Sequence, residues 1–476
     1  MDSKVKKLYL SVLDIYGDRT AERIVRTLRC KNANIPGTLG KLATTIGKVG
    51  VDIGNITTVH LGPHYTIRDI DVYAENEEQL GQVINEVSKL KEVSVLQVRD
   101  AVLEFHKNGK IKMINTVPIT SLDTLRKIYT PGVAEVCRLI ENQPSWKDTY
   151  TLIPYSVAIV TDGSRILGLG DIGPVAGMPV MEGKAALLQQ LVGVSGIPIL
   201  LNTKDPDQIV ETVKHIAPTF GGIQLEDIAP PRCFYIEDRL AGELNMPVMH
   251  DDQKGTAVVT LAALINACKL TKVTLQEAKV GLIGLGAAGF SIGKLLFKYT
   301  GNPALGTARS EASIKRHAEA GGIPSNFDEI MQKADIVIAT TGVRGIIDAS
   351  RVRKGQIIFA LSNPYPEITP EAARAAGAIL AADGRSVNNL LGFPGIWRGT
   401  LDAKAKKINY EMLKAASLAI AGAAAEGELV PSAIDTKMHL AVTHAVARAA
   451  AESGVAQRQL DDDYFASVDC KEPPWA

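Results

Sequence analysis

The sequence of 476 residues lacks several features that mark specialised protein classes. Its five cysteines are an odd number without CxxC spacing, which argues against a disulfide framework and favours a reducing compartment, the cytoplasm. It has no excess charge, because 52 Lys and Arg match 52 Asp and Glu. The longest apolar runs, near 258–268 and 417–425, are shorter than the roughly 18–20 residues of a membrane span. We expect no nucleic-acid partner and no membrane partner.

What the sequence does have is an ordinary globular composition, with 46% hydrophobic and 22% charged residues. The basic stretch MDSKVKKLYL is followed by an apolar part that Asp14 interrupts before it reaches signal-peptide form. At about 100–200 residues per domain, the length allows two to four domains. Changes in pattern place their bounds at 1–106, 107–252 and 253–476, with a basic connector over 106–118 after the first.

The first hundred residues alternate short strand-like and helical patterns. The runs IVRTLRC, VDIGNITTVHL, TIRDIDVYAE and VSVLQVRDAVLEF have strand character, and TLGKLATTIGKVG and EEQLGQVINEVSKLK have helical spacing of apolar residues. The resulting order, β-α-β-β-α-β, predicts a ferredoxin-like α+β module.

Residues 34–56, NIPGTLGKLATTIGKVGVDIGNI, resemble ACT domains, which are small regulatory modules that bind amino acids or similar effectors. The resemblance implies that Asn34, Gly37 and Leu39 contact an effector. Gly37 after Pro36 can supply a turn and free backbone N–H groups at a helix N-terminus. Alternatively, Pro36 and Gly37 only shape that turn, and the module serves dimerisation.

A glycine motif follows an apolar strand in KVGLIGLGAAGFSIGKLL. Gly284 permits a tight turn, Gly286 lets the backbone approach a pyrophosphate, and Gly289 allows close packing of the helix that opens at Ala287 and Ala288. The helix N-terminus then attracts phosphate. This context predicts a Rossmann-type dinucleotide-binding domain within an α/β fold.

The next strand, within NPALGTARS, lacks the terminal acid that commonly holds the ribose of NAD. Arg309 and Ser310 stand there instead, and a cation with a hydroxyl suits a 2′-phosphate. We therefore favour NADP over NAD. The alternative is that Arg309 lies on a solvated loop and that the site accepts either coenzyme.

Two further strand ends each deliver a pair of carboxylates, in GGIQLEDIAPPRCF and MPVMHDDQKGTA. The pairs are Glu226 with Asp227 and Asp251 with Asp252. Carboxylates that converge repel one another unless a cation neutralises them, and oxygen ligands suit Mg²⁺ or Mn²⁺. One isolated pair would more simply cap a helix, but two pairs favour a metal site.

Tyr129 in YTPGVAEVC and Lys184 in MEGKAALL are candidates for proton transfer. We expect Pro131 to start a helix beside Tyr129, and Lys184 to open another after Met-Glu-Gly. A lysine in such an apolar setting loses its proton more readily than in water, and a tyrosine near a cation becomes a usable acid. The alternative reading is structural, with a buried tyrosine and a surface lysine.

Over residues 115–450 the sequence resembles the malic enzymes, which oxidatively decarboxylate malate to pyruvate. Seven ordered motifs carry the resemblance: SLDTLRKIYTPGVAEVC, VTDGSRILGLGDIGPVAGMPVMEGKAALL, GGIQLEDIAPPRCF, MPVMHDDQKGTAVV, LIGLGAAGFSIGKLL, FALSNPYPEI and NNLLGFPGIWRG. The fold it implies is an α/β catalytic domain followed by the Rossmann domain and C-terminal helices that pack on the catalytic domain.

The resemblance also implies residue roles. Lys184 would be the general base at the malate hydroxyl, and Tyr129 the acid that protonates C3. The remaining roles are metal ligation by Glu226, Asp227 and Asp252, support of these ligands by Asp251, a malate carboxylate contact by Arg165, and substrate and nicotinamide contacts by Asn363 and Asn389.

Other readings stay open. Malolactic enzymes share these motifs but release lactate, and an ACT-bearing phosphoglycerate dehydrogenase would leave the tandem carboxylates unexplained. A reading of another class is a metabolite-sensing regulatory protein with an inactive catalytic scaffold. For the leading reading we expect malate as substrate, a metabolite effector, and a homodimer or homotetramer.

Overall fold

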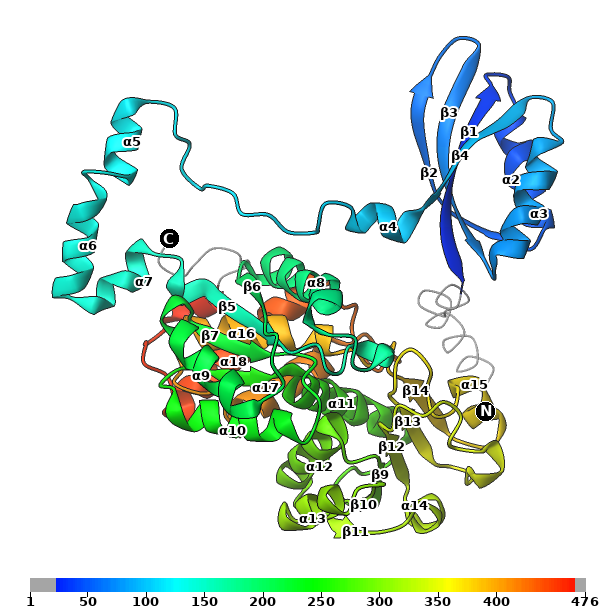
Figure 1. The fold of residues 1–476 in the computed structure, drawn as a ribbon. Coiled ribbons are helices and arrows are strands. Elements are labelled where there is room, and N and C mark those ends of the chain that lie inside the picture. Colours follow the sequence, from blue (N-terminus) through cyan, green and yellow to red (C-terminus); the bar gives the residue numbers. More distant parts are fainter. Residues whose placement is uncertain (1–22, 467–476) are drawn as a thin grey trace. The chain divides into compact units, whose positions relative to one another are not determined.

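The computed structural model describes residues 23–466 (Figure 1). It divides into two compact units, Met1–Lys112 and Met113–Ala476. The stretch MDSKVKKLYL, Asp14 and Cys470 lie outside the described residues, and the other four cysteines are free thiols. Within residues 23–466, no helix has both the length and the apolar character needed to span a membrane.

The first unit has the predicted element order. Its strands are β1 (Ile24–Ala33), β2 (Asp52–Leu61), β3 (Tyr65–Ala74) and β4 (Val93–Asp100), and its main helices are α2 (Thr38–Lys48) and α3 (Glu77–Ser88). The sheet is antiparallel in the order β2-β3-β1-β4, which is the ferredoxin-like arrangement.

Apolar side chains at helical spacing on α2 and α3 bury against β1 and β3 to form the core of this unit. The last strand is shorter than expected. It ends at Asp100, because the Asp100 carboxylate accepts a hydrogen bond from the Leu103 N–H and so starts the helix α4 (Ala101–His106).

The second unit contains two parallel sheets. The first has the order β6-β5-β7-β8, with β5 (Ser156–Thr161), β6 (Ser195–Leu200), β7 (Gly222–Leu225) and β8 (Val248–His250). α9 (Pro206–Ile216) and α10 (Arg232–Glu243) bury their apolar faces on one side. α8 (Pro174–Val192) and α16 (Phe393–Asp402) cover the other side, where Trp397 lies against Gly222.

The second sheet has the order β11-β10-β9-β12-β13-β14, all parallel. The order of these strands across the sheet is that of the Rossmann fold, as predicted. The strands are β9 (Val280–Ile283), β10 (Leu305–Thr307), β11 (Ile323–Pro324), β12 (Ile336–Ala339), β13 (Ile357–Ala360) and β14 (Leu380–Asp383). Helices α12 (Ala287–Thr300), α13 (Glu311–Glu319), α14 (Phe327–Lys333) and α15 (Pro370–Ala375) follow strands of this sheet.

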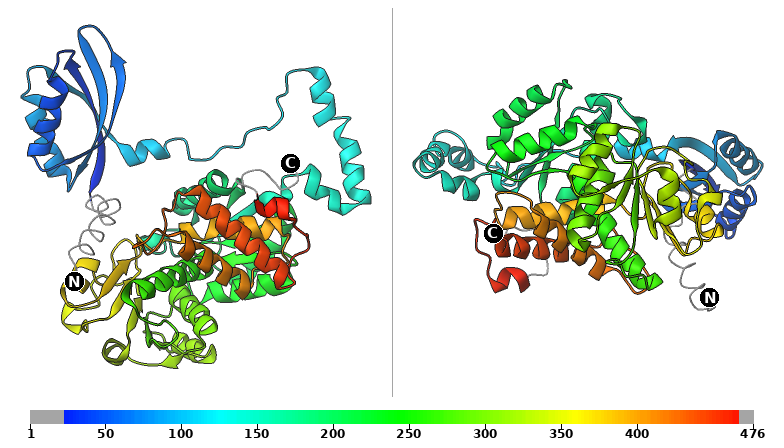
Figure 2. Two further views of the ribbon diagram at one scale, coloured as in Figure 1. Left: turned by 180° about the vertical axis from the view of Figure 1, so that it is seen from behind. Right: turned by 90° about the horizontal axis from the view of Figure 1, so that it is seen from below.

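One long buried helix, α11 (Asp251–Thr271), begins directly after β8 and leads toward the Rossmann sheet. α17 (Tyr410–Ala423) packs on α11, and α18 (Thr436–Glu452) packs on α16 and α17, which Figure 2 shows from two sides. The chain after the Rossmann sheet therefore returns to α8, which covers the sheet β6-β5-β7-β8.

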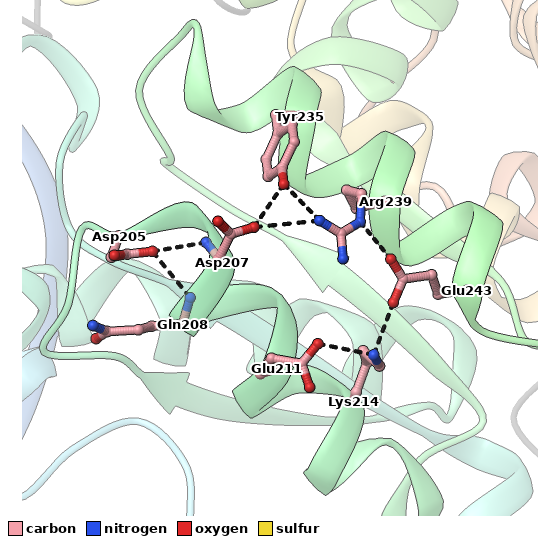
Figure 3. A network of polar contacts seen from close by, with 8 residues as sticks. All are labelled: Asp205, Asp207, Gln208, Glu211, Lys214, Tyr235, Arg239 and Glu243. Atoms are coloured by element: carbon pink, nitrogen blue, oxygen red, sulfur yellow. Dashed lines mark hydrogen bonds and ion pairs between the residues drawn. The ribbon is translucent and has the colours of Figure 1, made fainter.

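The outer sides of α9 and α10 are joined by the polar network in Figure 3. Asp205 caps α9 by accepting from the N–H groups of Asp207 and Gln208. The Tyr235 hydroxyl donates to Asp207 at 2.6 Å, and Lys214 lies 2.8 Å from Glu243. These contacts are exposed, so they align the helices on the surface and take no part in the buried site.

Candidate functional site

The two carboxylate pairs meet because their strands are neighbours. β7 ends at Leu225, directly before Glu226 and Asp227, and β8 ends at His250, directly before Asp251 and Asp252. β7 and β8 are parallel, so their carboxyl ends share one edge. One oxygen each of Glu226, Asp227 and Asp252 lies within 4.8 Å of the others.

Glu226 is held by a chain of hydrogen bonds that starts in the C-terminal helices. Its Oε2 accepts from Gln224 Nε2 at 2.7 Å, and Gln224 Oε1 accepts from Trp397 Nε1 at 2.6 Å. Glu226 is 2% exposed, and burial, only partly offset by Lys184, raises the pKa of its carboxyl well above the usual range. Gln224 and Trp397 were not among the site residues predicted from the sequence.

Asp227 adopts a backbone conformation that is rare for its residue type, with φ at 55°. Its N–H donates to Asp252 Oδ2 at 3.2 Å, and its carbonyl accepts from the Arg165 N–H at 3.0 Å. Strain of this kind persists where surrounding contacts fix the backbone, as they do here.

Lys184 lies inside α8 and does not open a helix, so that part of the prediction is wrong. α8 starts at Pro174, after Gly173 with φ at 82°, and continues through Pro179 to Val192. Lys184 Nζ is 3.1 Å from Glu226 Oε1, forms an ion pair with Asp251, and lies 4.4 Å from the centre of the Phe393 ring.

The expectation that Lys184 loses its proton readily because of apolar surroundings is also wrong for this arrangement. Burial favours the neutral amine, but Asp251 and Glu226 outweigh it and raise the pKa of Lys184 above its ordinary value. Asp251 is fully buried, and its Oδ1 has no hydrogen-bond partner within the described part of the chain. Lys184 is therefore the counter-ion of a carboxylate cluster.

The glycine loop after β9 has the predicted strand–turn–helix form. Gly284 has φ at 96°, and Gly286 precedes the first turn of α12, which includes Ala287 and Ala288. A Cβ at Gly289 would lie 1.9 Å from the Gly284 carbonyl oxygen. Only glycine allows this packing, which leaves the first N–H groups of α12 facing the end of the strand.

Of the three predicted substrate residues, Arg165 lies beside the glycine loop and Asn389 beside the helix of the carboxylate cluster. A Cβ at Gly286 would be 3.6 Å from Arg165 Nη1, so this guanidinium is beside the glycine loop. Asn363 Nδ2 donates to the Gly384 carbonyl at 2.9 Å. Asn389 lies against Gly255 on the first turns of α11, the helix that carries Asp251 and Asp252.

Arg309 and Ser310 follow β10 on the Rossmann sheet. Arg309 is exposed. Ser310 is the N-cap of α13 and accepts from the Ser313 N–H at 3.4 Å. The serine thus has a structural use, while the arginine is free to meet a ligand that approaches the end of the strand.

Tyr129 is not brought into the cluster. Tyr129 is the C-cap of α5 (Leu122–Ile128) and is 66% exposed. α6 (Val133–Asn142) begins after Gly132, so Pro131 precedes the helix and does not start it. Within residues 23–466, no hydrogen bond or ring contact joins the Tyr129 side chain to Lys184 or to the carboxylates.

The predicted effector residues are on the first unit. Gly37 has φ at 90° and precedes α2, without a side chain that caps the helix. Asn34 Nδ2 donates to the Gly62 carbonyl at 2.9 Å, and Leu39 is half-buried in the first turn of α2. The turn has the predicted form, and effector contact stays a prediction.

Residues 108–241 match the family model "Malic enzyme, N-terminal domain" and residues 253–321 match "Malic enzyme, NAD binding domain". NAD-dependent malic enzyme 1 of Bacillus subtilis (strain 168) is 58% identical over 432 residues, 90% of this chain and 98% of the relative. The bifunctional malic/malolactic enzyme of the same organism is 43% identical, over 78% of this chain and 97% of its own. The crystal structure of malic enzyme from Pyrococcus horikoshii Ot3 has a TM-score of 0.71 and 40% identity, and covers 76% of this chain and 93% of that chain.

Proposed function

Because the chain belongs to the malic enzyme family, we propose that it oxidatively decarboxylates malate to pyruvate and CO₂ while reducing a nicotinamide coenzyme. The observation that carries the proposal is the convergence of Lys184 with four carboxylates at the ends of β7 and β8. Arg165 connects this cluster to the glycine loop, because its backbone bonds Asp227 and its guanidinium lies beside Gly286.

We propose Glu226, Asp227 and Asp252 as ligands of Mg²⁺ or Mn²⁺. The donor set fits such an ion, since all three side chains offer carboxylate oxygens and Lys184 alone does not balance their charge together with that of Asp251. Burial is the main cause of the raised pKa of Glu226, and the carboxylates of Asp251, Asp252 and Asp227 raise it further. When bound, the metal supplies electrostatic stabilisation of negative charge that develops on substrate oxygen.

Lys184 is the proposed base for the malate hydroxyl. In the arrangement described, Glu226 and Asp251 hold its proton in place. Charge taken up by a cation on the carboxylates weakens that hold and favours the neutral amine. Asp251 then keeps the Nζ group oriented, which is the positioning role expected for it.

Tyr129 is the proposed acid that delivers a proton to C3 when pyruvate forms. A phenol hydroxyl can give that proton and recover it from solvent. Arg165 is proposed to pair with a malate carboxylate, because its guanidinium lies beside Gly286 and its backbone N–H bonds the Asp227 carbonyl. Asn363 and Asn389 are proposed to contact substrate and nicotinamide.

The choice between NAD and NADP has support on both sides. Arg309 is exposed at the end of β10, where a 2′-phosphate would pass, and this keeps NADP as a prediction. The relative with 58% identity is named NAD-dependent, which favours NAD. We propose that the site accepts both coenzymes and that Arg309 sets the ratio of their rates.

We propose that the first unit is an ACT-like regulatory module and that the second contains a catalytic domain over 107–252 and a coenzyme domain over 253–476. The ferredoxin-like strand order supports the first part. An amino acid or similar effector would meet the N-terminal turn of α2, which follows Gly37. Gly37→Val should then abolish any rate change that amino acids produce in the full chain, and an unchanged response would remove Gly37 from effector binding.

Initial rates with L-malate and Mn²⁺, with the carbon product identified, test the proposed function. Reduced coenzyme that appears with equal amounts of pyruvate and CO₂ supports it. Lactate without net coenzyme reduction would support the malolactic alternative, which the name of one relative makes worth testing. No turnover with either coenzyme and with amino acids present would favour an inactive regulatory scaffold.

A further inference from the structure

A glutamine occurs inside β7, a strand whose other residues are apolar and buried. Gln224 is 0% exposed and lies between Ile223 and Leu225. Burial of an amide costs free energy unless new hydrogen bonds replace those to water, and an apolar side chain of the same length avoids that cost. The presence of an amide here indicates a role that packing alone does not require.

Both ends of the Gln224 amide have partners. Its Oε1 accepts from Trp397 Nε1 at 2.6 Å, and its Nε2 donates to Glu226 Oε2 at 2.7 Å. An indole nitrogen can only donate a hydrogen bond, so the amide oxygen has to face Trp397. The amide N–H₂ group is thereby turned toward Glu226. Trp397 thus determines which end of Gln224 meets the carboxylate.

The alternation of β7 brings these partners to one face of the sheet. Side chains two positions apart along a strand point to the same side, which puts Gly222, Gln224 and Glu226 in one row. Glu226 continues the strand pairing, because its N–H donates to the Val160 carbonyl at 2.9 Å. The row therefore holds a glycine, an amide and a carboxylate in that order along β7.

The glycine of this row makes room for the indole ring. A Cβ at Gly222 would lie 2.3 Å from Cζ3 of Trp397, so the ring lies directly on the backbone of β7. Trp397 is 0% exposed, and all ten residues of α16 are buried. Close packing on both sides holds the indole N–H at one place relative to Gln224.

The helix that carries Trp397 is itself anchored through Asp402. Arg398 Nε donates to Asp402 Oδ1 at 2.9 Å. The hydroxyl of Tyr155, directly before β5, and the hydroxyl of Tyr464, in α19 (Asp462–Ala466), donate to Asp402 at 2.7 Å each. α16 is thus tied to the first strand of the sheet and to a helix near the end of the chain, as a rigid support requires.

From this row of contacts we propose that Gln224 and Trp397 are positioning residues, which orient the Glu226 carboxylate for the divalent cation. Gln224 donates to Oε2 of Glu226, and Lys184 Nζ lies 3.1 Å from Oε1. Two donors from separate elements, β7 and α8, thereby fix the rotation of the carboxylate. The inference rests on the proposed function, in which Glu226 is a metal ligand, and neither positioning residue is proposed to touch the cation.

Two substitutions separate the contacts of the row. Gln224→Met keeps the length of the side chain but removes both of its hydrogen bonds, and Trp397→Phe keeps an aromatic ring but removes the indole N–H. Titration of the full chain with Mn²⁺, followed by electron paramagnetic resonance without malate or coenzyme, gives the Kd of the cation. We expect each substitution to raise this Kd about 10–100-fold, as is usual for residues that orient a metal ligand. An unchanged Kd in either variant would overturn the proposal.

The double variant tests whether Trp397 acts through Gln224. If it does, Trp397→Phe raises the Kd for Mn²⁺ in the wild type but not in Gln224→Met, where the amide is already absent. An equal rise in both backgrounds would mean that the ring acts by its packing on Gly222. That result would overturn the role assigned to the indole N–H.

Gln356→Met is the matched control, because it makes the same change at another buried glutamine. Gln356 is 1% exposed, directly precedes β13 of the other sheet, and donates to the Met331 and Ala334 carbonyls. This variant should lower Tm but leave the Kd for Mn²⁺ unchanged. If it raises the Kd as much as Gln224→Met does, the effect is general destabilisation and the proposal fails.

Failure of the proposal differs from failure of the proposed function. Wild-type protein that binds Mn²⁺ as tightly as Gln224→Met and Trp397→Phe contradicts the positioning role alone. Wild-type protein that binds no Mn²⁺ contradicts the proposed metal site, on which the positioning role depends.

Discussion

The carboxylate–lysine cluster differs from helices α5 and α6, which flank Tyr129, in how far its reactive side chains are buried. Glu226 and Asp251 are buried and form ion pairs with the largely buried Lys184, whereas Tyr129 is mostly exposed and has none of these contacts. The cluster forms because β7 and β8 are adjacent and parallel, so one chain suffices to assemble it. The difference indicates that a single chain assembles the buried cluster, whereas it leaves the side chain of Tyr129 open to solvent.

The largest expected effect compares the two reactive residues directly. Lys184→Ala and Tyr129→Phe should each lower kcat by about 10²–10⁴, as is usual for acid–base groups. Their stability should differ, because removal of Lys184 leaves buried carboxylates without a counter-ion and costs about 3–5 kcal/mol in the absence of a divalent cation. Urea unfolding in EDTA measures this difference.

Tyr129→Phe removes only one hydroxyl from an exposed side chain and should leave the urea midpoint unchanged. Lys315→Ala, which removes an exposed lysine from α13, is the control for loss of positive charge. A Lys184→Ala variant with normal kcat would remove the base from the mechanism. Equal losses of stability for both variants would show that the Tyr129 side chain is as tightly packed as the cluster.

The next largest effect is expected at the glycine loop, where the backbone of Gly284 and that of Gly289 are in close contact. Gly289→Ala places a Cβ against the Gly284 carbonyl, and overpacking of this kind costs about 1–3 kcal/mol. We expect coenzyme Kd to rise about tenfold. Gly422→Ala, in α17 with open space at its Cβ, should bind coenzyme normally. Equal coenzyme Kd values for the two variants would contradict the close approach at the loop.

Arg309 shares one property with each of the two regions. It is exposed, as Tyr129 is, and it follows the end of a strand, as the carboxylates do. If it binds the 2′-phosphate, Arg309→Ala lowers kcat/KM for NADP⁺ about tenfold and leaves the value for NAD⁺ unchanged. Arg351→Ala, another exposed arginine on the Rossmann half, should change neither value. Equal effects on both coenzymes would assign Arg309 to the surface.

The smallest effect is expected on the outer face of α9 and α10. Arg239 bonds the Tyr235 hydroxyl and pairs with Asp207 and Glu243, but these contacts are exposed (Figure 3). Arg239→Ala should leave kcat unchanged and Tm within error at physiological salt, because exposed pairs contribute little and are screened. A clear fall in kcat would mean that the network reaches the site.

The strand-end residues were predictable from sequence because a local pattern, an apolar strand followed by carboxylates or by glycines, determines where they lie. The environment of Lys184 was not, since its partners come from residues up to 67 positions away. The same holds for Gln224 and Trp397, which are 173 positions apart in the chain. A glutamine within the otherwise apolar strand GGIQL was the one local signal of that contact.

Helix starts were the weakest part of the prediction. Pro131 and the Met-Glu-Gly before Lys184 look like helix openings, yet α6 begins after Gly132 and α8 begins ten residues before Lys184, at Pro174. In α8 the tertiary packing against β6 outweighs the local preference of Pro179 to interrupt a helix. The exposure of α5 and α6 could not be predicted from the sequence, because their apolar residues have the spacing of a helix that packs on a core.

Binding of Mn²⁺ to the full chain, followed by electron paramagnetic resonance without malate or coenzyme, tests most directly whether strand ends alone build the core of the site. One Mn²⁺ per chain should bind to the wild type and to Tyr129→Phe, and binding should be lost in Asp252→Asn. Unchanged binding in Asp252→Asn, or its loss in Tyr129→Phe, would contradict a metal site completed by the carboxylates of a single chain.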